Sequence, residues 1–82
     1  MRIAICDDDA DFTEKMRTLV EDGFAVYGEE PDISAYQDGA AFCSDEAEYD
    51  AVFLDIDMPQ VNGFDIAEQM NRKGKVFIIF VT

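Results

Sequence analysis

Two short apolar runs in this chain each end in aspartates, and this feature constrains the fold more than any other. Residues 3–6 are followed by Asp7, Asp8 and Asp9, and residues 51–54 are followed by Asp55. Short continuous apolar runs are typical of strands buried in a parallel sheet. The carboxyl ends of neighbouring parallel strands meet at one edge of the sheet, where open α/β sheets bind ligands. The sequence therefore predicts an α/β fold with a cluster of carboxylates at that edge.

Crowded carboxylates repel one another unless a cation lies among them. A hard divalent ion takes oxygen ligands, and Mg²⁺ commonly accompanies phosphate chemistry. Asp7, Asp8 and Asp55 are therefore candidate metal ligands, and the pattern points to phosphoryl transfer onto an aspartate. Aspartates that follow strands are also common as solvated loop residues or helix caps. That alternative stays open for each residue taken singly, and it is strongest for Asp9 and for the side chain of Asp57.

Strands and helices are expected to alternate along the chain. Apolar residues recur at helical spacing at positions 12, 16, 19, 20 and 24, with Asp9 as a candidate N-cap. Pro59 and Gly63 lie in a loop, and Gly74 ends the last helix. The sequence predicts strands over residues 2–6, 33–36, 51–54 and 76–81, the last covered on both faces, and helices over residues 10–26, 39–47 and 63–72. This order favours right-handed crossovers and a mainly parallel sheet in one domain, residues 1–82.

Composition narrows the class of protein. Eighty-two residues allow one small domain, and an apolar share of 49% is too high for a disordered acidic tail. The 6 basic and 19 acidic residues give a net charge of −13, which should repel nucleic acid and anionic membranes. There is no signal-like segment and no apolar run of membrane-spanning length, so a soluble cytoplasmic protein is expected. Cys6 and Cys43 lack metal-site spacing and are expected to be reduced.

Four spaced motifs give the chain a family resemblance. They are Ile-Cys-Asp-Asp-Asp at 5–9, Phe-Leu-Asp-Ile-Asp-Met-Pro at 53–59, Asn-Gly-Phe at 62–64 and Val-Thr at 81–82. Together they resemble the receiver domain of bacterial two-component response regulators, most closely the subgroup with a LytTR-type DNA-binding output domain. The resemblance implies a flavodoxin-like (CheY-like) parallel sheet of order 2-1-3-4. It also implies a non-enzymatic phosphoacceptor in phosphorelay signalling, a sensor histidine kinase as partner and a role in transcription regulation.

The resemblance also implies roles for individual residues. Asp55 would be the phosphoacceptor that takes a phosphoryl group from the kinase. Asp8 would bind Mg²⁺ directly, Asp7 would help through water, and the backbone carbonyl of Asp57 would be a further ligand. Thr82 would hydrogen-bond the phosphoryl group and shift on phosphorylation, which is the switching step of the family.

The sequence departs from the family pattern at its carboxyl end. A complete receiver continues with a fifth strand that carries a phosphate-contacting lysine, and Lys73 and Lys75 lie at the wrong end of the fourth strand to replace it. We therefore expect an N-terminal fragment of a receiver, with impaired phosphorylation. The fourth strand, residues 76–81, would form an exposed sheet edge, so we expect self-association, most simply as a homodimer.

Two alternatives use the same aspartates. Haloacid-dehalogenase-like phosphatases place a nucleophilic aspartate after an apolar strand and an acid two residues later, which Asp55 and Asp57 satisfy, with Thr82 as a second motif. That interpretation leaves the aspartates after the first strand unexplained. An EF-hand loop that begins at Asp55 fails, because Pro59 and Gln60 stand where an oxygen ligand and a glycine are required.

Overall fold

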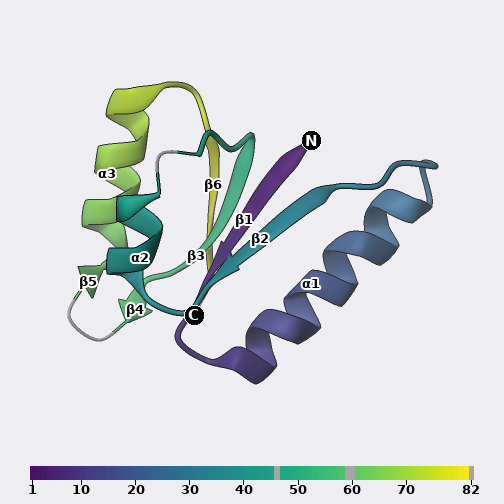
Figure 1. Ribbon diagram of the computed structural model, residues 1–82, viewed down its shortest axis with the longest axis horizontal. Coiled ribbons are helices and arrows are strands. Elements are labelled where there is room, and N and C mark those ends of the chain that lie inside the picture. Colours follow the sequence, from purple (N-terminus) through teal and green to yellow (C-terminus); the bar gives the residue numbers. More distant parts are fainter. Residues whose placement is uncertain (46, 59–60, 82) are drawn as a thin grey trace.

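A four-stranded sheet lies between two layers of helices in the computed structural model, which describes residues 1–45, 47–58 and 61–81. Helix α1 covers one face of the sheet, and α2 and α3 cover the other (Figure 1). The elements are β1 (Arg2–Cys6), α1 (Ala10–Ala25), β2 (Asp32–Tyr36), α2 (Gly39–Ser44), β3 (Ala51–Asp55), β4 (Asp57–Met58), β5 (Val61–Asn62), α3 (Gly63–Lys73) and β6 (Phe77–Val81). Among the described residues, no helix is both long enough and apolar enough to cross a membrane.

The sheet has the strand order β2-β1-β3-β6, and all of its neighbouring strands are parallel. Because β6 is the fourth strand of this sheet in the chain, the predicted order 2-1-3-4 is confirmed. Cys6 at the end of β1 pairs with Leu54 in β3. The carboxyl ends of β1 and β3 therefore lie side by side, as the order implied by the family resemblance requires.

Alternating side chains divide the core between the two faces of the sheet. On the face of α2 and α3, the largest fully buried side chains include Leu54, Val52 and Ile66. On the face of α1, Ile3, Val20 and Ala51 form a smaller cluster. The central strands β1 and β3 contribute to both clusters, which explains their continuous apolar sequences.

Short polar side chains and one glycine set the helix ends. The carboxylate of Asp9 accepts hydrogen bonds from the backbone N–H groups of Asp11 (3.0 Å) and Phe12 (3.2 Å) at the start of α1. Asn62 caps α3 in the same way, since its side-chain oxygen accepts from the Phe64 N–H at 2.8 Å. Gly74 follows α3 with φ of 159°. The predicted N-cap at Asp9 and helix end at Gly74 are confirmed.

Helix α2 is shorter than the sequence predicted. The expected helix over residues 39–47 ends at Ser44, and Asp45 has extended backbone dihedrals. The carboxylate of Asp45 accepts hydrogen bonds from the Ala47 N–H and from the Tyr36 hydroxyl. These bonds draw the chain out of the helix, because aspartate side chains compete with helical hydrogen bonding.

The apolar pattern of residues 76–81 is typical of a strand covered on both faces, and this does not hold for the described residues, whereas the exposed edge expected of the fourth strand is confirmed for them. Strand β6 lies at the sheet edge, and Phe77 is 76% exposed. Leu19, predicted to be in the apolar stripe of α1, is also exposed. Phe77 and Leu19 both lie on the side of the sheet that is covered by α1 alone. A single helix is too narrow to bury every apolar side chain on that side. The loop predicted after β3 contains the short antiparallel pair of β4 and β5, which was not predicted.

Candidate phosphoryl-transfer site

Three aspartates gather where β1 and β3 end. Carboxylate oxygens of Asp7, Asp8 and Asp55 all lie within 4.8 Å of one another. Asp7 is buried, with only 7% of its surface exposed, whereas Asp55 is half-buried and Asp8 is exposed. Solvent exposure therefore decreases across the cluster, from Asp8, which is exposed, through Asp55 to Asp7, which is buried. The structure brings together the three residues that the sequence predicted as a cluster.

Local hydrogen bonds hold Asp7 in place. Its backbone N–H donates to the Tyr36 carbonyl at 3.0 Å, which extends the pairing of β1 and β2 beyond Cys6. Its carboxylate accepts from the Asp9 N–H at 2.9 Å, and Asp9 in turn caps α1. The carboxylates of Asp7 and Asp9 thus fix the segment between β1 and α1, because each accepts hydrogen bonds from backbone N–H groups of that segment or of the first turn of α1.

Electrostatics disfavour an empty cluster. Burial raises the pKa of the Asp7 carboxyl above its ordinary value, and the nearby charges of Asp55 and Asp8 raise it further. The hydrogen bond from the Asp9 N–H opposes this shift. Because the charged form of Asp7 is disfavoured in the fold, a cation that neutralises the cluster has a clear energetic advantage.

Gly63 allows α3 to begin directly against the end of β3. A Cβ atom at position 63 would lie 2.7 Å from the Cα of Ile56 and 2.8 Å from the carbonyl oxygen of Asp55. The Gly63 N–H also donates to the Ile56 carbonyl at 3.4 Å. Since real Cβ atoms do not approach backbone so closely, only glycine fits without a shift of the strand end that carries Asp55.

The donor set fits a hard divalent cation. Three carboxylates supply oxygen ligands, which Mg²⁺ prefers, and the open side at Asp8 leaves room for water or a phosphate oxygen. The backbone of Asp57 lies in β4, two residues beyond Asp55. Nothing is described of the Asp57 side chain, and Thr82 and Pro59 lie outside the described residues.

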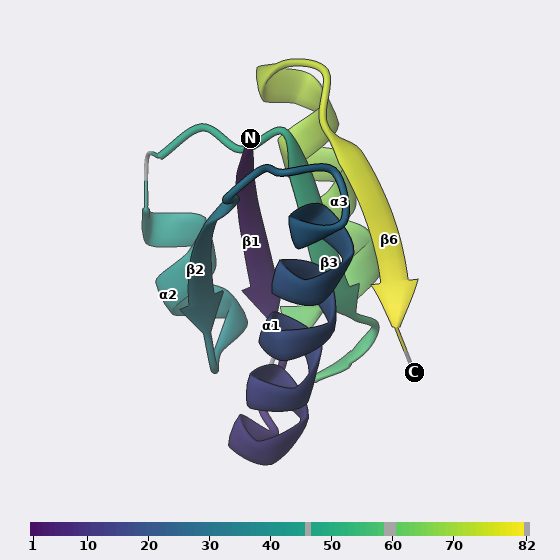
Figure 2. The same cartoon turned by 90° about the vertical axis from the view of Figure 1, so that its right-hand side faces the viewer.

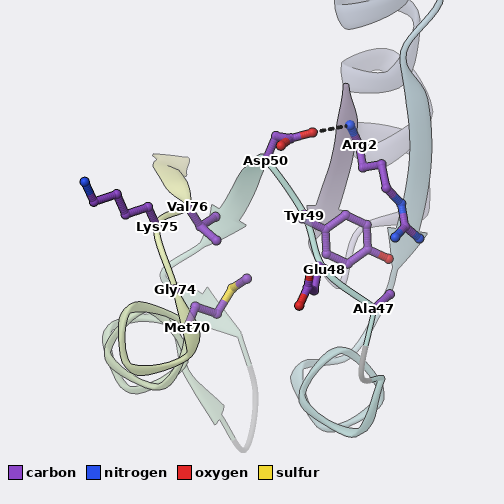
Figure 3. A pocket seen from close by; sticks show the side chains of 9 residues that line it. All are labelled: Arg2, Ala47, Glu48, Tyr49, Asp50, Met70, Gly74, Lys75 and Val76. Carbon is purple, nitrogen blue, oxygen red and sulfur yellow. Dashed lines mark hydrogen bonds between the residues drawn. The ribbon is translucent and has the colours of Figure 1, made fainter.

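A cavity of about 670 Å³ lies at the other end of the sheet (Figure 3). It includes Arg2, whose backbone N–H donates to the Asp50 carboxylate at 2.8 Å and whose guanidinium lies 5.5 Å from the centre of the Tyr49 ring. Arg2 begins β1 and Asp7 follows its end, so about 16 Å of strand separates the cavity from the acidic cluster. The cavity is not part of the site.

A hydrogen-bonded tyrosine pair was missed by sequence reasoning. The Tyr36 hydroxyl donates to the Asp45 carboxylate and lies 2.5 Å from the Tyr49 hydroxyl. Burial raises the pKa of Tyr36, and its bonds to Asp45 and Tyr49 add to the shift. This contact ties the end of β2 to the segment before β3. No local pattern indicated it, because it joins residues 13 positions apart.

Both cysteines are free. Cys6 is buried, its Sγ lies 3.7 Å from the Sδ of Met58, and burial raises its pKa to about 12. A thiol with so little thiolate at neutral pH is neither a nucleophile nor a ready metal ligand. Cys6 is therefore a core residue beneath the acidic cluster.

Comparison with known families decides the assignment. The family model of the response regulator receiver domain matches residues 3–82. The chain belongs to this family. It is a receiver domain of a two-component response regulator, and the phosphatase alternative is not supported.

Individual relatives agree with the assignment. The chain is 37% identical over 76 residues to a protein named as a probable transcriptional regulatory protein, SilR, of Salmonella typhimurium, covering 92% of this chain and 31% of SilR. The MaeR response regulator bound to beryllium trifluoride is similar at a TM-score of 0.83 and 25% identity, over 100% of this chain and 66% of that one. The chain thus spans about a third of SilR and about two thirds of the MaeR chain.

A third match is a complex of the histidine kinase ThkA with the response regulator TrrA. It has a TM-score of 0.63 and 30% identity, over 99% of this chain and 67% of that chain. With the family membership, these matches place the protein in two-component phosphorelay signalling. A non-enzymatic role is consistent with the family.

Proposed function

We propose that Asp55 is the phosphoacceptor of this receiver and takes its phosphoryl group from a sensor histidine kinase. The observation that carries the proposal is the gathering of three carboxylates within 4.8 Å at the ends of two adjacent parallel strands. If Asp55 were only a solvated loop residue or a helix cap, there would be no reason for the carboxylates of Asp7 and Asp8, from a distant part of the chain, to lie beside it. A phosphoacceptor site with its cation does need them.

In the proposed reaction, a carboxylate oxygen of Asp55 attacks the phosphorus atom of a phosphohistidine. The new O–P bond gives an acyl phosphate, and the P–N bond breaks to return the histidine to the kinase. The half-buried position of Asp55 leaves its carboxylate accessible to the donor. Gly63 keeps the backbone behind Asp55 in place, since any side chain there would displace it.

Asp8, Asp55 and the backbone carbonyl of Asp57 are proposed to hold Mg²⁺, with Asp7 acting through water. When bound, the ion would neutralise the charge on the incoming phosphoryl group. Phosphoryl transfer depends mainly on such charge neutralisation and on the positioning of the reacting groups. Asp7 orients the segment through its bond to the Asp9 N–H. Thr82 is proposed to hydrogen-bond the phosphoryl group, on the resemblance alone.

We propose a weak reaction for the 82-residue chain itself. Phosphoryl transfer benefits from an ammonium group near the acceptor, and in the described part of the chain Lys75 and Arg72 lie at the opposite end of β6. The long-range field is unfavourable too, because a net charge of −13 repels a phosphorylated donor.

The partner proposal rests on the family and on the TrrA complex with its histidine kinase. A DNA-binding output domain in a longer protein is proposed from the resemblance to the LytTR subgroup. The net charge of −13 repels nucleic acid and anionic membranes, so we propose that this segment contacts neither. A cytoplasmic location and self-association through β6 also stay predictions.

A Mg²⁺ titration followed by NMR tests the site. We expect millimolar affinity, with amide shifts centred on Asp7, Asp8 and Asp55, since few ligands are fixed and the site has excess negative charge. Asp8→Asn should abolish the shifts. The matched control Asp22→Asn, an exposed carboxylate near the end of α1, should leave them unchanged. Shifts that are absent, or spread over the acidic surface, would show that these residues are not the site.

A further inference from the structure

We propose that Met58 is a positioning residue for the proposed Mg²⁺ site. Its buried side chain packs on Cys6 and so holds the backbone of Asp57 beside the aspartates that follow β1. The inference rests on the proposed function, in which Asp8 and the Asp57 carbonyl are ligands. The Sγ of Cys6 lies 3.7 Å from the Sδ of Met58. Cys6 directly precedes Asp7, and Met58 directly follows Asp57, so this contact joins the two segments that carry the proposed ligands.

The two segments meet at one edge of the sheet. Strands β1 and β3 run side by side to that edge (Figure 2), and β4 lies just beyond the end of β3, at the lower ends of α2 and α3 in Figure 1. Cys6 is the last residue of β1, and Met58 is the last residue of β4. They are 52 positions apart in the chain, so only the fold brings their sulfur atoms together.

Both side chains belong to the larger core cluster. Cys6 is fully buried and Met58 is 7% exposed, and they share this cluster with Leu54 and Ile66. Protein cores are close-packed, so a side chain buried in one has little freedom to move. The burial of Met58 therefore restrains the backbone of β4 relative to β1.

The peptide bond passes this restraint to the proposed ligand. The carbonyl group of Asp57 and the nitrogen and Cα atoms of Met58 lie in one planar peptide group. A shift of the Met58 Cα therefore moves the carbonyl oxygen of Asp57 as well. Cys6 and Asp7 share a peptide group in the same way, and the Asp7 N–H is fixed by its bond to the Tyr36 carbonyl at 3.0 Å.

The other contacts of the segment after β3 act at its base or on β5. The Gly63 N–H donates to the Ile56 carbonyl at 3.4 Å, which closes the base. Strand β5 lies beside α2 and α3, and it pairs with β4 over only two residues. Such short hairpins are marginal by themselves. Among residues 56–62 whose side chains the structure describes, Met58 alone is buried, so it ties β4 itself to the core.

Side-chain volume matters more at this contact than sulfur chemistry. A thiol is a weak donor and a thioether is a weak acceptor, so the bond itself contributes little. Methionine is flexible and fills irregular gaps in a core, and leucine of similar volume is usually tolerated in its place. Met58→Leu should therefore keep β4 in position, whereas Met58→Ala would leave a cavity beside Cys6 and release β4.

A released β4 should affect Mg²⁺ more than Ca²⁺. Mg²⁺ demands near-ideal octahedral geometry, whereas Ca²⁺ accepts flexible arrangements of oxygen ligands. Met58→Ala should therefore weaken Mg²⁺ binding about tenfold, the lower end of what supporting residues contribute at metal sites, and weaken Ca²⁺ binding much less. Met58→Leu should restore Mg²⁺ binding. A loss of folded protein alone would weaken the apparent binding of both ions by the same factor.

Titration of the chain with each cation alone at fixed ionic strength, followed through the amide resonances of Asp7 and Asp8, gives both dissociation constants. The matched control Ile66→Ala removes a buried side chain of the same core, outside the segments that carry the proposed ligands, and should leave the ratio of the two constants unchanged. An unchanged ratio in Met58→Ala, or an equal change in Ile66→Ala, would overturn the positioning role and leave the site in place. A native chain that binds no Mg²⁺ would overturn the site itself, and this inference with it.

The unmodified chain provides a test that needs no variant and decides if Met58→Ala does not fold. With isotopically labelled methionine methyl groups, the Met58 resonance should shift on addition of Mg²⁺ with the same dissociation constant as the amides of Asp7 and Asp8. The methyl group of Met70, which packs against the same core from α3, is the control and should not shift. A Met58 resonance that stays in place while the Asp7 and Asp8 amides shift would show that the residue does not position the site.

Discussion

Replacing Asp7 with asparagine should stabilise this protein in the absence of metal. Asparagine keeps the side-chain oxygen that accepts from the Asp9 N–H, and it removes one charge from a cluster whose oxygens lie within 4.8 Å of one another. At that separation, two like charges repel by about 0.9 kcal/mol in bulk water and by about 3.5 kcal/mol at an effective dielectric constant of 20. Because Asp7 is 7% exposed and Asp8 lies in solvent, we expect a net gain of about 1–3 kcal/mol at pH 7.

The gain should depend on pH in a definite direction. Burial and neighbouring carboxylates raise the pKa of Asp7 in the fold, so its protonated form contributes stability that is present below the unfolded pKa. This stability is lost as pH rises through the folded pKa. The Asn variant carries no charge at position 7 at any pH, so it does not lose this stability. The difference between the two should therefore shrink as pH falls towards the ordinary value of 3.8.

Urea unfolding with and without Mg²⁺ is the assay. At tenfold excess over its dissociation constant, Mg²⁺ adds about 1.4 kcal/mol to a protein that binds it only when folded. The native protein should gain this amount of stability on adding Mg²⁺, and Asp7→Asn should gain less. The difference in the free energy of unfolding between variant and native protein should therefore shrink or change sign. The surface control Asp22→Asn should stay within about 0.5 kcal/mol of native under all conditions. A variant that is less stable than native without metal would refute the reasoning.

Three further changes probe the surroundings of the site. Gly63→Ala should lower the free energy of unfolding by about 1–3 kcal/mol, because the new Cβ would lie 2.7 Å from the backbone. Gly23→Ala, within α1 and with open space around it, should raise the free energy of unfolding by about 1 kcal/mol. Thermal unfolding of the two variants measures this difference. Tyr36→Phe should lower the free energy of unfolding by about 1 kcal/mol through loss of its hydroxyl bonds, and an unchanged urea midpoint would show that these bonds contribute nothing. Iodoacetamide at pH 8 should label half-buried Cys43 and spare Cys6, whose pKa is about 12, and mass spectrometry would show equal labelling if this is wrong.

The parts that the sequence predicted correctly are those set by local pattern and by sheet topology. The apolar runs before Asp7 and Asp55 indicated two buried strands, and the alternation of strands and helices implied a mainly parallel sheet. The order 2-1-3-4 that the family resemblance implies placed these two strands side by side. The cap at Asp9 and the glycine at position 74 are local signals with fixed stereochemistry. Together with the implied strand order, these signals are sufficient to locate the carboxylate cluster.

The parts that could not be predicted depend on contacts between distant elements. Helix α2 ends early because Asp45 bonds to Tyr36, and nothing in the helix sequence itself reveals that partner. The closeness of Gly63 to the Ile56 backbone is likewise set by how α3 packs against β3. The apolar run of residues 76–81 does not itself show whether the strand lies at an edge or in the centre of a sheet, and the expected edge position came from the family resemblance.

Phosphorylation mapped to a residue is the most direct test of the central claim. The 82-residue chain should be incubated with radiolabelled acetyl phosphate, with Mg²⁺ or with a chelator, and the label should then be challenged with hydroxylamine, which cleaves acyl phosphates. We predict weak labelling that requires Mg²⁺, is removed by hydroxylamine and is lost in Asp55→Asn but not in Asp22→Asn. Labelling that persists in Asp55→Asn, or that does not depend on Mg²⁺, would contradict the assignment of Asp55 as the phosphoacceptor.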